Sequence, residues 1–596
     1  MIAPEGAVRR HRDTGSKTSR REGARRLVEE LAATAPRFSL DRRAKLRLLR
    51  RLAVCPIQQA DVLRRLHEAL CLLEAYPDDA RVLAAVDRAL ARIPARVRLL
   101  GDRAAALHDS GIAGTALFYP FGLPMARWLL SRFGAQVDVA WERFDEGERL
   151  EDVLSLVVRH AENDALTDFG LDWRAWLSVA RGGRRLTDLQ LLVELFERAP
   201  LPPDVRDWLF DSVELPIEWK LLGPGGSRTF ARLPGFRAFY ATQASARPTD
   251  VDVLAEIERP LPSLRPAPRP LARALVEAAR LAMATRHREL HAFSYANPED
   301  VLVAEPGRGL RIALIGILPE FRLPFETFYG YLVLRNGVPI GYGGAWHLFG
   351  TLWFGINIFE TFRGGESVFI ATQALRVFRH ALGVRDVVLE PFQVGDDNPE
   401  ALASAAFYFY YRLGFRPVDP ALARLAERER EKRARDSSYR SPLRMLKRFA
   451  GAEMHLSLSR GQAAPGARLK AAYLAALVTD HIARRFHGDR GAAAEAIPRQ
   501  VSRALGLRRW TAWRREEREA FERLSLLAAV VPRLARWPAA AKRHLAHVLR
   551  AKGAPSEIDY ARQLDAHLRF RRSLEALVRR LPAGRGGRTR GNQTAR

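Results

Sequence analysis

The segment from Arg363 to Ser367 contains the residues whose types and spacing most clearly indicate chemistry. It reads Arg-Gly-Gly-Glu-Ser and lies between an apolar run, Leu352–Phe359, and an amphipathic run, Val368–Leu382. Glycines let a backbone approach a bound group closely, and free amides at the start of a helix attract anions. The segment therefore predicts a site for a phosphate-bearing cofactor. The alternative is an ordinary strand-to-helix turn in which the glycines serve backbone geometry alone.

The residues around this segment predict a sheet followed by alternating helices and strands. Residues 308–360 contain successive apolar runs, and Asn336-Gly337 between two of them favours a tight hairpin because both residues tolerate positive φ. We expect an antiparallel meander there. The amphipathic helix, a strand at Asp386–Leu389 and a helix at Glu400–Leu413 should follow.

This order of elements resembles the GNAT (N-acetyltransferase) superfamily over roughly residues 300–420, and the last helix ends in the similar sequence FYFYYRLGFRP. The resemblance implies a mixed-sheet domain that binds acetyl-coenzyme A or another acyl-coenzyme A. The loop and the following helix would hold the pyrophosphate, and the pantetheine arm would lie between two splayed strands. The cofactor-binding residues implied are Ile358, Phe359, Phe362, Arg363, Gly364, Gly365, Glu366 and Ser367.

The usual loop of the superfamily is Gln/Arg-x-x-Gly-x-Gly/Ala, and two frames of this chain match it in part. A frame that begins at Arg363 places Glu366 and Val368 at the small positions. A frame that begins at Phe362 keeps Gly365 and Ser367 but loses the leading Arg or Gln. A catalytically inactive GNAT-like interaction scaffold is therefore an alternative to an enzyme.

The resemblance further implies acyl transfer to an amine acceptor, with named residues handling the protons. Tyr410, four residues before Gly414, is expected to protonate the departing thiolate. Glu360, beside the loop, is expected to accept the proton of the amine. A backbone N–H near Ile358 would stabilise the oxyanion.

Other polar residues offer alternatives to these assignments. Asn357 and His347 are rivals of Glu360, although a histidine among apolar strand residues is more often packed than catalytic. Asp396 and Asp397 would line the acceptor pocket or belong to a helix-capping turn. The histidines are scattered, so we expect no metal site.

Composition limits the class of protein and of partner. The 596 residues have a formal net charge of +28, which indicates an anionic partner reached through basic tails, or an arginine-rich composition without such a partner. A basic nucleic-acid-binding protein is thus a second alternative. The two cysteines, the lack of a membrane-length apolar run and the lack of a secretory signal predict a cytoplasmic protein without a membrane span.

The predicted fold class is α+β and multi-domain, with the GNAT-like domain between large helical regions. The aromatics of residues 105–250 are expected in a core. The predicted divisions are a basic disordered tail (1–24), a helical N-terminal region (25–258), a proline-rich linker (259–272), the GNAT-like domain (273–420), a helical basic C-terminal region (421–580) and a disordered Gly/Arg tail (581–596).

Overall fold

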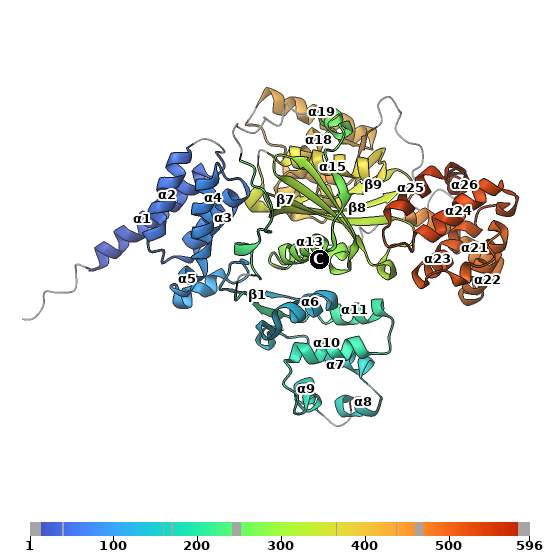
Figure 1. Ribbon diagram of the computed structural model, residues 1–596, viewed down its shortest axis with the longest axis horizontal. Coiled ribbons are helices and arrows are strands. Elements are labelled where there is room, and N and C mark those ends of the chain that lie inside the picture. Colours follow the sequence, from blue (N-terminus) through green and yellow to red (C-terminus); the bar gives the residue numbers. More distant parts are fainter. Residues whose placement is uncertain are drawn as a thin grey trace, which may run out of the picture. The chain divides into compact units, whose positions relative to one another are not determined.

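The computed structural model describes residues 13–37, 41–158, 160–167, 171–223, 225–240, 252–364, 366–436, 438–458 and 469–581. The protein is α+β, has a large mixed sheet, and divides into two compact units (Figure 1). Unit 1 comprises residues 1–245, 277–289 and 335–339, and unit 2 comprises residues 246–276, 290–334 and 340–596. Residues 1–12 and 582–596, which belong to the expected tails, lie outside the described residues.

Unit 1 is helical around a small antiparallel sheet of order β1-β3-β2. The sheet was not predicted, because strands of three or four residues are too short to show an alternating pattern. Its strands are β1 (Ala116–Tyr119), β2 (Val137–Val139) and β3 (Ile217–Lys220). Its helices are α1 (Asp13–Thr34), α2 (Arg42–Val54), α3 (Ala60–Ala75), α4 (Ala80–Ala91), α5 (Ile93–Arg98), α6 (Leu123–Phe133), α7 (Gly147–Val157), α8 (His160–Thr167), α9 (Trp173–Arg181), α10 (Asp188–Arg198) and α11 (Pro203–Ser212).

Two expectations for unit 1 need correction. Helix α1 begins at Asp13, so residues 13–24 are helical rather than part of a disordered tail. Most tryptophans of this region lie in its core, and Trp219 is fully buried, but Trp208 is 67% exposed.

Unit 2 is built on the large sheet, whose strand order is β12-β13-β11-β9-β8-β7-β6-β5-β4, with β10 paired to β8. Strands β9 and β11 are parallel, whereas their outer neighbours β8 and β13 are antiparallel to them. The strands are β4 (Leu264–Pro266), β5 (Ala296–Gly307), β6 (Leu310–Ile317), β7 (Thr327–Arg335), β8 (Val338–Leu348), β9 (Thr351–Phe354), β10 (Asn357–Ile358), β11 (Asp386–Leu389), β12 (Arg416–Pro417) and β13 (Met454–Ser457).

The predicted meander is confirmed in its essentials. Strands β6, β7, β8 and β9 lie side by side in chain order. The hairpin between β7 and β8 turns at Asn336 and Gly337, whose φ values are 51° and 84°. Both central residues thus have the positive φ that a tight hairpin requires.

Four boundaries differ from the prediction. The expected strand Leu352–Phe359 is broken into β9 and β10, and the expected helix Glu400–Leu413 is broken at Ala405, which has a φ of 52°. The proline-rich linker is not a free spacer, because β4 within it forms an edge strand, a position that tolerates proline. Strand β13, from beyond residue 420, lies inside the sheet between β11 and β12.

Helices cover both faces of the sheet. Helix α15 (Ser367–Leu382) packs on one face. There the ring centroid of Phe378 lies 5.4 Å from that of Tyr331 and 6.5 Å from that of Phe354. The opposite face carries α14 (His291–Ser294), whose Ala292 and Phe293 lie so close to Gly330 that a side chain there would clash. The other helices of unit 2 are α12 (Val253–Glu258), α13 (Arg269–Ala284, shared with unit 1), α16 (Pro391–Val394), α17 (Pro399–Ala403), α18 (Ala406–Arg412), α19 (Pro420–Arg435) and α20 (Leu443–Ala450).

The C-terminal helices form a bundle that shares a core with the sheet instead of the separate region we expected (Figure 1). Leu348, Phe349, Trp353 and Val388 of the sheet belong to the same apolar cluster as the bundle side chains. The bundle consists of α21 (Ala471–Phe486), α22 (Arg490–Leu505), α23 (Arg515–Ala529), α24 (Ala539–Ala551), α25 (Ile558–Ala566) and α26 (Leu568–Val578).

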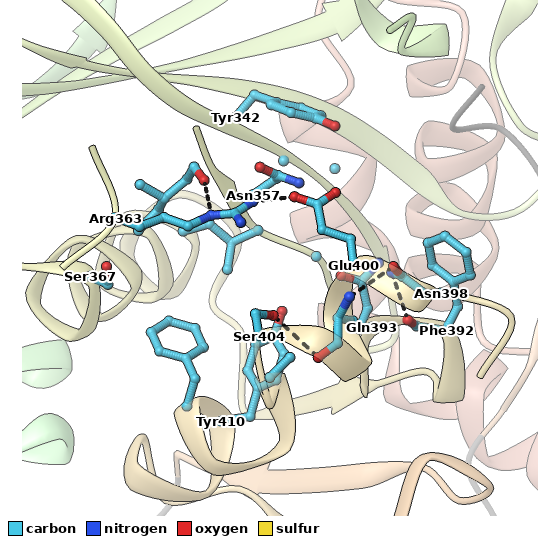
Figure 2. A pocket seen from close by; sticks show the side chains of 18 of the residues that line it. Tyr342, Asn357, Arg363, Ser367, Phe392, Gln393, Asn398, Glu400, Ser404 and Tyr410 are labelled. Carbon is cyan, nitrogen blue, oxygen red and sulfur yellow. Dashed lines mark hydrogen bonds and ion pairs between the residues drawn. The ribbon is translucent and has the colours of Figure 1, made fainter. Parts of the chain in front are cut away.

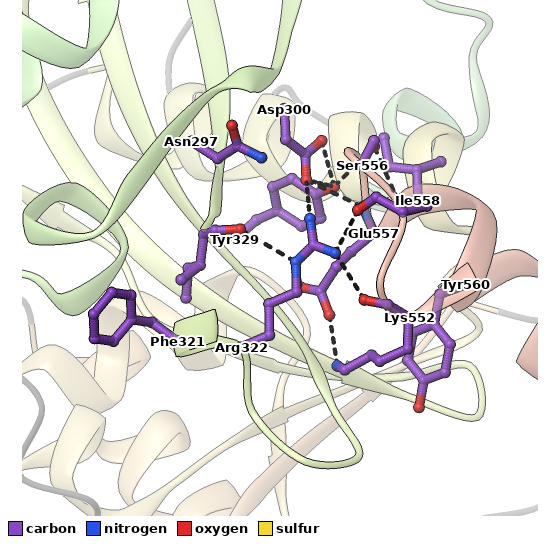
Figure 3. A network of polar contacts seen from close by, with 12 residues as sticks. Asn297, Asp300, Phe321, Arg322, Tyr329, Lys552, Ser556, Glu557, Ile558 and Tyr560 are labelled. Atoms are coloured by element: carbon purple, nitrogen blue, oxygen red, sulfur yellow. Dashed lines mark hydrogen bonds and ion pairs between the residues drawn. The ribbon is translucent and has the colours of Figure 1, made fainter. Parts of the chain in front are cut away.

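A buried polar network centred on Arg322 fastens this bundle to the sheet (Figure 3). Its Nη1 donates to the carbonyls of Lys552 and Ala554 at 2.7 and 2.6 Å, and its Nη2 donates to that of Pro555 at 2.9 Å. The backbone N–H of Glu557 donates to Asp300 Oδ2 at 3.1 Å. The side chains of Arg322, Asp300 and Glu557 are each 1% exposed, so the network is shielded from water.

We predict that Arg322→Met lowers the free energy of unfolding by about 3–5 kcal/mol. The reason is that the buried carboxylates and carbonyls around Arg322 lose the guanidinium group that they contact. Urea unfolding of the full chain measures the effect. Arg273→Met, at an exposed position of α13, is the control and should change it by less than about 0.5 kcal/mol. Equal unfolding midpoints for both variants would contradict a role for the network in joining bundle and sheet.

Candidate functional site

The central feature of unit 2 is a gap between two parallel strands. Strands β9 and β11 pair over three residues, the last pair being Trp353 and Val388. Beyond this point the segment after β9 continues along β8 as β10, in the same register and after an irregularity at Gly355 and Ile356, whereas β11 ends at Leu389. A pocket of about 440 Å³ lies where the strands separate (Figure 2).

The pocket combines an apolar wall with polar groups from several elements. The turn between the strands contributes Gly355, Ile356, Asn357 and Ile358, and Tyr342, Gly343, Gly344 and Trp346 come from β8. The chain after β11 contributes Glu390, Phe392, Gln393, Asn398, Glu400, Ala401 and Ser404. The remaining lining residues are Leu290, Arg363, Gly364, Ser367, Ala406, Phe409, Tyr410 and Arg412. Such a mixture is typical of small-molecule sites.

The turn at Gly355 opens the gap, and two contacts hold it. The hydroxyl of Tyr331 donates to the Gly355 carbonyl at 2.7 Å, and the Gly355 N–H donates to the Gly344 carbonyl at 3.0 Å. Gly343 lies beneath the turn, where a Cβ atom would be 2.0 Å from the Gly355 oxygen. Only glycine fits at this close approach of two neighbouring backbones.

Tyr410 points its hydroxyl group at this turn. It lies on α18, is 3% exposed and lines the pocket. Burial raises its pKa, while a hydrogen bond with the backbone of Ile356 acts in the opposite direction. A hydrogen bond that lowers a phenol pKa comes from an N–H donor, so the Ile356 amide faces the Tyr410 oxygen. Tyr410 is therefore a neutral phenol that can give a proton inside the pocket.

Glu390 is the carboxyl group that the structure brings to the pocket at the end of a parallel strand. It follows β11 directly and is partly buried. Burial raises its pKa, Glu453 raises it further, and Lys470 lowers it. A carboxylate with a raised pKa is a better proton acceptor than an exposed one.

The glycine-rich loop borders the pocket beside the start of α15. Gly364 has a φ of 146° and no atom within 4 Å of an added Cβ, so its backbone is accessible. Its N–H donates to Ser367 Oγ at 3.3 Å. Arg363 donates from Nε to the Ile358 carbonyl at 2.9 Å and forms an ion pair with Glu400 (Figure 2). Gly365 lies outside the described residues.

The structure gathers some of the predicted residues and disperses others. Ile358, Arg363, Gly364, Ser367, Tyr410 and the rival Asn357 line the pocket. Phe359 and Phe362 are buried in the core and do not line it, and neither does Glu366. Glu360 is exposed and is also outside the lining.

The remaining predicted residues lie outside the pocket or have a structural role at its border. The Nε2 atom of His347 lies 3.3 Å from Asp565 Oδ2 of the bundle, away from the pocket. Asp396 and Asp397 are exposed and do not line the pocket. The next residue, Asn398, caps α17 by accepting from the Ala401 N–H at 3.1 Å, so Asp396 and Asp397 belong to a helix-capping turn.

Sequence reasoning missed Glu390, Gln393, Glu400 and the aromatic wall formed by Tyr342 and Trp346. A usable signal existed for Glu390, because ligands often bind beyond the carboxyl ends of parallel strands. Another signal was the Gly343-Gly344 pair inside an apolar strand, since glycines there often mark a close approach of backbone.

No protein-family model, curated protein or solved structure gives a significant match to this chain. Within the described ranges, no helix is both long enough and apolar enough to cross a bilayer. The same ranges contain no group of three or more His, Cys, Asp or Glu side chains suited to a metal ion.

The Arg363–Glu400 pair gives a direct prediction about anion binding. Glu400→Gln frees the guanidinium beside the helix N-terminus, so the affinity for inorganic pyrophosphate should rise about two- to fivefold, the value of an exposed ion pair. Isothermal titration measures it. Glu360→Gln removes the same charge outside the pocket and is the control. Equal affinities for both variants would show that Arg363 does not contact the anion.

Proposed function

We propose that this protein transfers an acyl group from coenzyme A to an amine, as the resemblance to the GNAT superfamily implies. The observation that carries the proposal is the separation of β9 and β11 around a pocket that reaches the glycine-rich loop. Exposed backbone at a strand edge can pair with the amides of an extended pantetheine arm. The start of a helix beside it suits a diphosphate.

The residues present fit an acyl-coenzyme A in most respects. Gly364 leaves open space above its backbone, and α15 begins three residues later. Arg363 is close enough to line the pocket but is engaged by Glu400, so phosphate binding would exchange one anionic partner for another. When bound, the thioester supplies an activated acyl group. The protein supplies orientation and proton transfer.

Tyr410 is proposed as the acid. Its phenol stays protonated because burial raises its pKa, and its oxygen already contacts the Ile356 amide. These two donors meet at one point of the pocket. The amide near Ile358 stays a candidate oxyanion donor beside that of Ile356, because the ladder with β8 uses the N–H groups of Gly355 and Phe359 and not that of Ile358.

Glu390 is proposed as the base in place of Glu360. It lies in the pocket at the end of β11, and its raised pKa favours uptake of a proton from an ammonium group. Its carboxylate also favours a cationic amine at this position. Gln393 and Asn398, from the following turn, add polar groups that would orient the acceptor.

A non-catalytic scaffold is the second candidate, and one observation favours it. Arg363 and the Gly364 amide, two groups expected to face phosphate, already have protein partners. Titration of the full chain with acetyl-coenzyme A separates the two functions. Saturable binding supports the transferase, whereas no heat and no thermal shift would support the scaffold.

We predict that Tyr410→Phe lowers kcat about 100-fold and changes the KM for acetyl-coenzyme A less than about threefold, because the phenol acts on the leaving group rather than on binding. Release of free thiol in the presence of primary amines measures both constants. Tyr411→Phe is the control, since that hydroxyl donates to Glu427 Oε2 at 2.6 Å outside the pocket. Equal loss in both variants would contradict the assignment.

The pH dependence tests Glu390. A base must be deprotonated, and its pKa is raised, so kcat/KM should fall with decreasing pH at a higher pH than an ordinary glutamate would give. Glu390→Gln should remove this acid limb and lower kcat/KM about 100-fold at pH 8. If Glu360→Gln removed the acid limb of kcat/KM and Glu390→Gln kept it, Glu360 and not Glu390 would be the base.

A further inference from the structure

The positive charge of this protein is concentrated in one part of unit 2. Residues 421–581 contain 36 Lys and Arg against 16 Asp and Glu, a net +20. Residues 25–420 contain 50 against 49, a net +1. The tails, 1–24 and 582–596, add only +3 and +4. We therefore expect the folded C-terminal part, and not the tails, to bind the anionic partner.

Within the bundle, the segments around the starts of α24 and α26 contain basic residues and no acidic ones. No Asp or Glu occurs between Leu524 and Ser556 or between Ala566 and Leu574. We define the basic end of the bundle as six residues that come from the 3-10 turn before α24 and from the first turns of α24 and α26. They are Arg533, Arg536, Lys542, Arg543, Arg569 and Arg572.

Contacts between these segments hold the six residues on one region of the bundle. The Nζ of Lys542 donates to the Ala535 carbonyl at 3.3 Å, and the guanidinium of Arg569 lies 5.7 Å from the Trp537 ring. His567, next to α26, contacts the Ala541 carbonyl at 3.0 Å and stacks with His544 at 4.6 Å. The start of α26 therefore lies beside the start of α24.

Four of the five guanidinium groups in this set have no side-chain partner among the described residues. Arg533, Arg536, Arg543 and Arg572 are exposed, and their side chains make no hydrogen bond or ion pair with any residue that the structure describes. By contrast, three other arginines of the bundle, Arg499, Arg523 and Arg550, each pair with a glutamate. Unpaired arginines in an acid-free region produce a local positive potential that an anion would neutralise.

We propose that the basic end of the bundle binds the phosphate backbone of a nucleic acid. Five of its six cations are arginines, whose planar guanidinium matches phosphate oxygens in a bidentate manner. A membrane surface is less suited, because Leu568 is the only exposed large apolar side chain in the described segments 530–548 and 566–574, and peripheral helices need an apolar face. The inference is independent of acyl transfer.

The experiment measures binding of the full chain to a duplex DNA and a single-stranded RNA of about 20 nucleotides by fluorescence anisotropy between 50 and 200 mM salt. Wild-type protein should bind at least one of them with an affinity that falls steeply with salt. The variant with Arg533, Arg536, Arg543 and Arg572 changed to Gln should bind at least about tenfold more weakly, with a salt slope shallower by about three units.

A charge-matched control decides whether this region or the net charge is responsible. Arg424, Arg428, Arg508 and Arg509 are exposed arginines elsewhere in unit 2, and their joint change to Gln removes the same charge. That variant should keep its affinity within about twofold. Equal weakening of both variants, no binding of either nucleic acid, or binding only to phosphatidylserine vesicles or to a polyglutamate peptide would overturn the proposal.

Discussion

The rest of the site depends on one constraint, the release of β9 from β11 after the Trp353–Val388 pair. Tyr331 from β7 holds the Gly355 carbonyl, and the missing side chain of Gly343 leaves room for that carbonyl beside β8. An uninterrupted ladder would leave no pocket. At this break in the strand the Ile356 amide faces the hydroxyl of Tyr410, a residue that is only 3% exposed. Polar groups so placed act more strongly than they would in water.

The C-terminal bundle is part of the architecture that supports this gap. Arg322 binds the carbonyls that precede α25, His347 of β8 lies beside Asp565 of the bundle, and Val388 of β11 belongs to the bundle's core. Residues 421–581 of the same unit, which include the bundle, have a net charge of +20 out of the protein's +28. One compact unit thus contains a candidate catalytic pocket and a surface that we propose binds a polyanion, and each proposal has its own observations.

Much of the local structure could be predicted from sequence, because its causes are local. Asn336-Gly337 specified the hairpin, and the bounds of β11 matched the expected strand. The break at Gly355 could not be predicted, because its cause is Tyr331, which comes from another strand. The position of Glu390 was not predicted either, because only the structure shows that the residue after β11 lines the pocket, whereas Glu360 after β10 is exposed outside it. Likewise β4 could form within a proline-rich segment because it is an edge strand, and proline is tolerated at the edge of a sheet.

The most direct test of the central claim is a crystal structure of the full chain with a non-reactive acetyl-coenzyme A analogue. The account predicts that the pantetheine arm lies between Gly355–Ile358 and Glu390–Gln393, with the thioester position next to Tyr410. An analogue bound at any other place, or a crystal in which β10 and the chain after β11 are joined by hydrogen bonds with no space between them, would contradict it.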